Sequence, residues 1–131
     1  MSDFLGSFGI IPPADFYQKI DAGFILFIYA QEEGNRIGFV VKINDNQNFK
    51  TIVTTWEQKM KTDFTSLFSL MAQTETTTPY FKTAVYKTVP FRYQTFSVPH
   101  FGICYSIYNN YFIFTSSGKS MMKTIDQLMQ K

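Results

Sequence analysis

The stretch NQNFKTIVTTWEQKMKTDFTSLFSLMA, residues 46–72, carries its apolar side chains at the spacing of an amphipathic α-helix. Asn44, Asp45 and Asn46 stand at its start, and each is a plausible helix N-cap. The apolar positions recur three and four residues apart and would line one face: Phe49, Ile52, Val53, Trp56, Met60, Phe64, Leu67, Phe68 and Met71. We predict that Trp56, Phe64 and Phe68 are buried against a β-sheet.

Two β-hairpins on either side of this helix supply most of that sheet. In the first, residues 24–29 and 36–43 are rich in β-branched and aromatic residues, and a polar loop at 31–35 joins them. In the second, residues 103–108 and 111–115 flank Asn109-Asn110. Asn adopts a positive φ more readily than most residues, so this pair is typical of a two-residue hairpin turn.

The remaining segments are assigned from Pro residues and helix caps. Residues 81–98 are expected to be extended, in one or two pieces around Pro90, because Pro is tolerated at an edge or a break of a sheet. Ser116 or Ser117 would cap a final helix with an apolar face. Near the N-terminus, Pro12-Pro13 followed by residues 14–17 predicts a short helix.

Together these elements predict an α+β fold. An antiparallel sheet of about five strands, made of two hairpins plus the middle extended segment, packs on the long amphipathic helix and the C-terminal helix. With 131 residues, the chain has the size of a single domain. We therefore expect one domain over 1–131, in which residues 1–22 form a lead-in segment and residues 23–131 form the α+β core.

The strands are apolar on both faces, which predicts that both faces are covered. If the helices cover one face, the other needs the lead-in segment, a second copy or a missing domain. We therefore expect self-association, or docking of a neighbouring module, through the apolar sheet face that carries Phe27, Tyr29, Tyr111 and Ile113. In the internal alternative the lead-in covers that face with Phe4, Leu5, Phe8, Ile10 and Phe16.

Composition and charge argue against several classes of function. Hydrophobic residues reach 45% and charged residues 17%, which excludes a disordered polyelectrolyte. The net charge of +2 is spread along the chain, so we expect no nucleic-acid partner. His100 is the single histidine and Cys104 the single cysteine, and we expect no metal and no cofactor. Cys104 has the setting of a small buried hydrophobe.

The motif Gly118-Lys119-Ser120 resembles the end of a phosphate-binding P-loop. A P-loop needs a further glycine five positions before Gly118, and that position is Ile113. We therefore expect a capped helix start and no nucleotide binding.

The candidate site residues lie on the long helix and on the strands that follow it. Glu57 stands beside Trp56 at the border of the apolar helix face, either as a site acid or in an ion pair with Lys61 or Arg92. A pocket between sheet and helix would draw on Trp56, Glu57, Tyr93 and Tyr105. We expect no catalytic residue. The residues that we name for a pocket or an ion pair are Trp56, Glu57, Arg92, Tyr93 and Tyr105.

Four short stretches resemble the soluble domains of uncharacterised bacterial membrane-anchored proteins, loosely of the DUF3352 type. They are Phe27-Ile28-Tyr29 with Gly38-Phe39; Trp56-Glu57-Gln58-Lys59-Met60 with Asp63-Phe64; Phe91-Arg92-Tyr93; and Ile113-Phe114-Thr115-Ser116 with Ser120-Met121 and Ile125-Asp126. The resemblance implies an extracytoplasmic domain that follows a single anchoring helix and has no known catalysis. The anchor would lie outside this sequence; a cytoplasmic location is the alternative.

Two functions therefore stay open at this point. The first is a non-catalytic binding or structural domain of the bacterial envelope, which is not an enzyme. The alternative is a small-molecule-binding or enzymatic α+β domain with a pocket between the sheet and the long helix. A pocket with converging polar groups would favour the alternative, and a flat apolar face would favour the first.

Overall fold

The structure is a computed structural model that describes residues 1–70 and 80–130. Its α+β fold contains a six-stranded antiparallel sheet with the strand order β1-β2-β6-β5-β4-β3. The strands are β1 (Ile20–Gln31), β2 (Gly34–Ile43), β3 (Lys82–Tyr86), β4 (Val89–Thr95), β5 (Gly102–Tyr108) and β6 (Tyr111–Thr115). The helices are α1 (Ser2–Ser7), α2 (Asn46–Phe68) and α3 (Gly118–Met129), with a 3₁₀ turn at Tyr17–Lys19.

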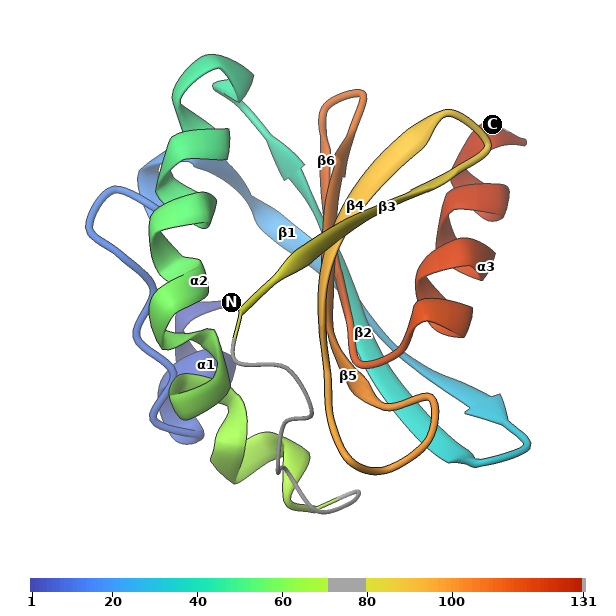
Figure 1. Cartoon of the computed structure of the whole chain (residues 1–131). Coiled ribbons are helices and arrows are strands. Elements are labelled where there is room, and N and C mark those ends of the chain that lie inside the picture. The colour runs from blue at the N-terminus through green and yellow to red at the C-terminus, as the bar shows by residue number, and fades with distance from the viewer. Residues whose placement is uncertain (71–79, 131) are drawn as a thin grey trace.

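The elements form three layers, with the sheet in the middle. Figure 1 shows α1 and α2 on one side of the sheet and α3 on the other. Each helix turns its apolar stripe toward the strands, so two separate clusters of buried side chains lie on the two faces of the sheet. No helix in the described residues is both long enough and apolar enough to cross a membrane.

Aromatic rings fill the cluster between α2 and the sheet. Phe64 of α2 stacks on Phe114 of β6 with ring centroids 4.3 Å apart, and Trp56 lies 5.3 Å from Phe16 of the lead-in. Trp56, Phe64 and Phe68 are all buried, as the helical spacing predicts. This packing sets the rotation of α2 and therefore the direction of its neighbouring polar side chains.

The C-terminal helix packs on the face opposite α2 and covers the part of it around Ile113, while Ile25 on the same face stays 61% exposed. Met121 and Ile125 of α3 are fully buried in a cluster that includes Ile113 of β6. Ile113 is thus not available to a partner. The lead-in does not cover this face either, since Leu5, Ile10 and Phe16 belong to the cluster on the α2 side.

The middle extended segment forms a complete hairpin, which raises the strand number to six. Its turn lies at Lys87 and Thr88, both with positive φ (49° and 69°), and not at Pro90. Pro90 pairs with Val85 of β3, but the ladder between β4 and β5 begins only at Arg92. Because β5 is not paired with β4 at Pro90, the sheet does not need the backbone N–H that proline lacks.

Two helix boundaries also differ from the prediction. The N-terminal helix is α1, and the segment after Pro12-Pro13 contains only the 3₁₀ turn at Tyr17–Lys19. Asp15 has a φ of 74°, which interrupts a right-handed helix at that residue. The long helix ends at Phe68, short of the predicted residue 72; residues 71 and 72 lie outside the described residues.

Candidate functional site

An ion pair between α2 and β4 joins three of the five predicted site residues. The Arg92 guanidinium donates through Nε and Nη2 to the two carboxylate oxygens of Glu57, at 2.7 and 2.8 Å. The Tyr105 hydroxyl, on neighbouring β5, donates to the same carboxylate. Arg92 Nη1 donates to Thr83 Oγ1 at 2.9 Å. Of the partners that the sequence suggests for Glu57, the structure selects Arg92.

The strand register explains why these groups meet. Arg92 and Tyr105 are directly paired residues of β4 and β5, so their side chains project side by side from the same face of the sheet. Thr83 is the partner of Arg92 across the β3–β4 ladder. Glu57 comes down onto this row from α2, and its side chain is only 11% exposed.

Both hydrogen-bond donors to the Glu57 carboxylate, Arg92 and Tyr105, have a raised pKa, and Glu57 contributes to both shifts. The hydrogen bond to Glu57 is the largest cause of a raised pKa for Arg92, so the guanidinium stays positive. Burial, followed by the Glu57 carboxylate, raises the pKa of Tyr105 above its ordinary value of 10.0. Tyr105 therefore remains a neutral hydrogen-bond donor at neutral pH.

A groove of about 500 Å³ opens beside the ion pair, between the first half of α2 and strands β3 to β5. Lys50 and Thr54 line it from the helix, and Thr83, Arg92 and Tyr105 line it from the strands. Asn46, Pro90, Phe91, Ser106 and Ile107 complete the lining. The lining thus combines two cationic groups with hydroxyls and apolar surface, and it includes no carboxylate.

Sequence reasoning missed Lys50, Thr54 and Thr83 as lining residues. A signal for two of them was present, because Lys50, Thr54 and Glu57 are spaced four and three residues apart and share one stripe of the helix. Thr83 had no such signal, since its place depends on the β3–β4 pairing.

Trp56 lies next to this site but does not line the groove. Its ring is buried against Phe16 and Phe64, and its indole N–H donates to Asp63 Oδ2 at 2.8 Å. Trp56 therefore helps to hold α2 in place, which in turn positions Glu57.

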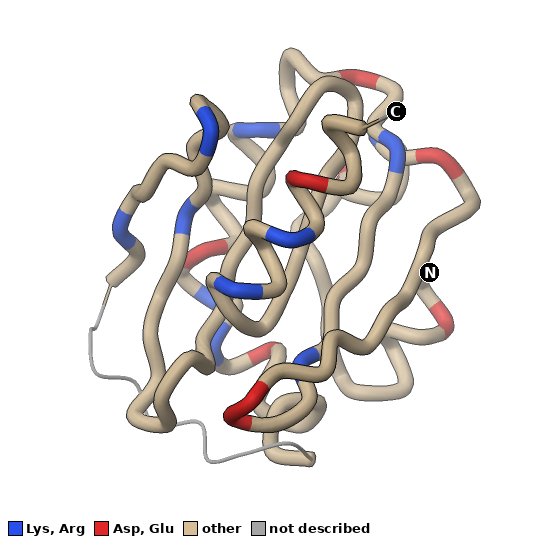
Figure 2. The backbone as a smooth tube through the Cα atoms, turned by 90° about the vertical axis from the view of Figure 1, so that its right-hand side faces the viewer, with Lys and Arg blue, Asp and Glu red and all other residues tan. Residues whose placement is uncertain are grey.

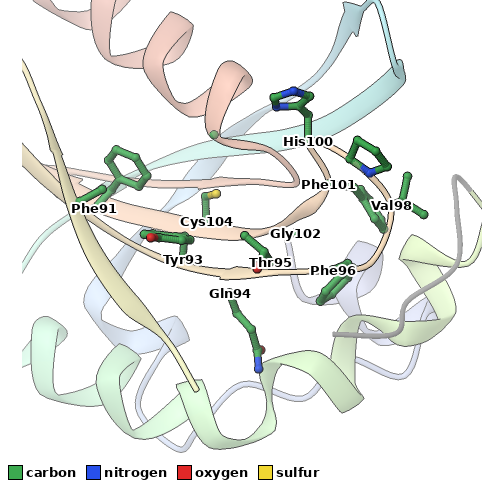
Figure 3. A pocket seen from close by; sticks show the side chains of 13 residues that line it. Phe91, Tyr93, Gln94, Thr95, Phe96, Val98, His100, Phe101, Gly102 and Cys104 are labelled. Carbon is green, nitrogen blue, oxygen red and sulfur yellow. The ribbon is translucent and has the colours of Figure 1, made fainter. Parts of the chain in front are cut away.

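Tyr93 belongs to the other face of the sheet, away from Glu57. Successive strand residues point to opposite faces, so Tyr93 is directed away from its neighbour Arg92. It lines a second pocket, of about 360 Å³, together with His100 and Cys104 (Figure 3). Burial raises the pKa of the Cys104 thiol to about 12, which leaves the thiol protonated at neutral pH.

Gly118, Lys119 and Ser120, the residues of the P-loop-like motif, form the first turn of α3. This turn is capped, as expected from the sequence. Ser117 is the N-cap, and its side-chain oxygen accepts a hydrogen bond from the backbone N–H of Ser120 at 3.0 Å. The Lys119 ammonium is paired with Glu33, with N–O distances of 3.0 Å to both carboxylate oxygens.

Arg36 is a buried cation that sequence reasoning did not single out. Its guanidinium donates to the backbone carbonyls of His100 (2.8 Å), Asn35 (2.9 Å) and Pro99 (3.3 Å), and it lies over the Phe101 ring at 5.0 Å. Burial lowers the pKa of Arg36. The residue ties the loop between β4 and β5 to β2, which is a structural role.

Comparison with known proteins adds no family assignment. No model of a protein family matches the sequence, and no curated protein matches it at a significant level. The resemblance to DUF3352-type domains therefore stays a prediction.

Among residues 1–70 and 80–130, no three His, Cys, Asp or Glu side chains are grouped so that they could hold a metal ion.

Proposed function

We propose that this chain is a non-catalytic binding domain, and that it holds a small anionic molecule with an apolar body in the groove beside α2. The observation that carries the proposal is the groove lining, in which, within the described part of the chain, Lys50 supplies unpaired positive charge, Arg92 offers the N–H donors that Glu57 and Thr83 leave free, and no carboxylate is included. Ligand sites are typically concave and largely apolar, with a few polar groups that fix orientation. A carboxylate or sulfonate on an apolar chain or ring fits that description.

The fixed position of Arg92 supports binding at this place. Glu57 and Thr83 together take three of the five N–H donors of the guanidinium, so the side chain is already ordered before a ligand arrives. A cation held in this way loses little conformational entropy on binding an anion. Lys50 is exposed at the rim, where it can add attraction without being desolvated.

The surroundings of Glu57 and Tyr105 favour binding over catalysis. The Glu57 carboxylate already accepts two hydrogen bonds from Arg92 and one from Tyr105, which together take three of its roughly four acceptor sites. A carboxylate stabilised in this way by a bound cation and a hydroxyl donor is a weak general base. Tyr105, with its raised pKa, is a donor and not a base.

Three probes with the same apolar chain and different head groups test the proposal: octanoate, octanol and octylammonium. Their binding is followed by amide chemical shifts, which also locate the ligand. We expect octanoate to bind most tightly, with the largest shifts in the first half of α2 and in β4 and β5. Equal binding of octanoate and octylammonium, or shifts that map to the α3 face, would contradict the proposal.

A pair of matched variants separates the groove from general surface charge. Lys50→Gln removes the cation at the rim, and we expect it to weaken octanoate binding about threefold to tenfold. Lys59→Gln removes a cation from the exposed side of the same helix, away from the groove lining, and should leave binding unchanged. If both variants weaken binding equally, only the net charge of the protein matters and the groove is not the site.

The expected place of the domain in the cell belongs to the same proposal. The resemblance stated above favours a bacterial extracytoplasmic location behind a membrane anchor. The full open reading frame tests this expectation, because an upstream transmembrane segment would support it and a cytoplasmic neighbour domain would contradict it.

A further inference from the structure

Strand β1 forms one outer edge of the sheet, and its ladder with β2 is regular from Phe24 to Gln31. The strand spans twelve residues and pairs only with β2. In an antiparallel ladder every second residue of an edge strand directs its N–H and C=O groups away from its single neighbour. Such a row of free backbone groups is a template for another strand.

From Phe24 onward this edge lacks the features that usually block strand addition, since the irregular pairing and Asp21 lie before that point. Residues 22–31 contain neither a charged residue nor a proline. Side chains on both of its faces are exposed, with exposed fractions of 61% for Ile25, 43% for Leu26 and 70% for Ile28. Figure 2 shows this strand as a run without charged residues between acidic residues at its two ends.

The opposite edge of the same sheet is protected in the expected way. Strand β3 has only five residues, begins at Lys82 and is followed directly by Lys87. Short edge strands and lysine side chains are common devices against edge-to-edge pairing. The β3 edge is therefore protected against strand addition, whereas residues 24–31 of the β1 edge are not.

We propose that β1 pairs with β1 of a second copy of this chain, in antiparallel orientation around a two-fold axis at Phe27. This register brings Leu26 opposite Ile28 of the second copy and Ile25 opposite its Tyr29. Each of these cross-strand pairs is apolar or aromatic, which stabilises a ladder. The acidic residues at Asp21, Glu32 and Glu33 fall outside the paired segment 24–30.

The surface next to the edge also fits a second copy. A groove of about 450 Å³ runs between β1 and α3 and is lined by Ile25, Phe27 and Leu128, among others. A two-fold axis perpendicular to the sheet places the grooves of both copies on the same face, on either side of the new strand pair. The pairing places Tyr29 of the second copy beside Ile25, at the border of its groove.

The dimer is expected to be weak and reversible. A stable interface of standard size buries about 800 Å² on each partner. Seven paired residues and the side chains around them fall below that area, so association in the micromolar range is expected. This inference goes beyond the proposed ligand groove, which lies at β3 to β5 near the other end of the sheet. Either one can fail without the other.

Sedimentation equilibrium from low micromolar to millimolar concentration tests the proposal. We expect the mass to rise from monomer to dimer with concentration and not beyond. Ile28→Lys should shift the dissociation constant upward by tenfold or more, because it places a charge opposite Leu26 of the second copy. Val85→Lys is the matched control: Val85 is 66% exposed on the opposite edge strand, and its replacement should leave the dimer intact.

A second measurement on the unchanged protein guards against misfolding of a variant. Amide hydrogen exchange at low and high protein concentration should show protection that grows in residues 24–30 and stays constant in β3. A monomer at all concentrations would overturn the proposal. So would equal loss of the dimer in Ile28→Lys and Val85→Lys, or concentration-dependent protection located elsewhere.

Discussion

Replacing Trp56 by alanine tests the packing that positions the candidate site. The side chain is 1% exposed, and its ring lies 5.3 Å from Phe16 and 5.6 Å from Phe64, measured between centroids. Removing a fully buried aromatic side chain costs about 3–5 kcal/mol of unfolding free energy. The lost hydrogen bond from the indole N–H to Asp63 contributes to that loss. We expect Trp56→Ala to lower the free energy of unfolding by about 4 kcal/mol.

The comparison with Trp56→Phe divides this value into its parts. Phenylalanine keeps most of the buried ring and loses the indole N–H, so we expect a loss of about 1.5–2.5 kcal/mol for this variant. Asp63→Ala should cost about 1 kcal/mol in the natural background and much less when residue 56 is Phe, because the hydrogen bond is then already absent.

Urea denaturation followed by far-ultraviolet circular dichroism is the suitable assay. Trp56 is the single tryptophan of the chain, so its fluorescence is lost in both variants. Leu70→Ala, at an exposed residue just beyond α2, is the control and should change stability by less than about 0.5 kcal/mol. A loss below about 1 kcal/mol for Trp56→Ala, with an unchanged denaturant slope, would refute the assignment of this helix face to the core.

Three further predictions follow from individual side chains. The Cys104 thiol, with its pKa raised to about 12, should not react with a thiol reagent at mildly alkaline pH until the protein is unfolded; fast reaction in the folded state would be unexpected. The hydrogen bond from Lys87 lowers the pKa of Asp126 in the folded protein below its ordinary value of 3.8. The Asp126 carboxylate therefore contributes fully to stability above pH 3.8, and this contribution is lost as the pH falls through the lower pKa of the folded state. Urea midpoints measured down to acid pH should therefore fall less steeply in Asp126→Asn. Arg36→Leu should cost about 2–4 kcal/mol in thermal or urea unfolding, because the carbonyls of Pro99 and His100 lose a charged donor; a loss below about 1 kcal/mol would show that water replaces it.

Features that depend on local sequence were predicted well. The hairpin turn at Asn109-Asn110 is confirmed, with Asn109 at a φ of 51°, and Ser117 caps α3. The turn at Lys87 and Thr88 was missed because neither residue type favours a positive φ, and Pro90 offered a stronger but misleading signal.

The candidate site was predicted only in part, because its members come from segments distant in sequence. Glu57 and Arg92 were named as a possible ion pair, and they meet across 35 residues. Tyr93 was placed with them although it neighbours Arg92 in a strand. Neighbouring residues of a strand point to opposite faces of the sheet, so Arg92 and Tyr93 could not both have contributed to a site on one face.

The sequence by itself determined the long helix, the two hairpins and the C-terminal helix with their amphipathic faces, because helix spacing, turn residues and caps act over a few residues. It could not decide which face of the sheet each helix covers. That choice depends on how α2, α3 and the lead-in compete to bury two apolar faces of one sheet, and every strand offers both faces equally. Only the tertiary structure placed α3 alone on the face beside Ile113 and left the edge of β1 open, since strand order is a property of the whole sheet and not of any single strand.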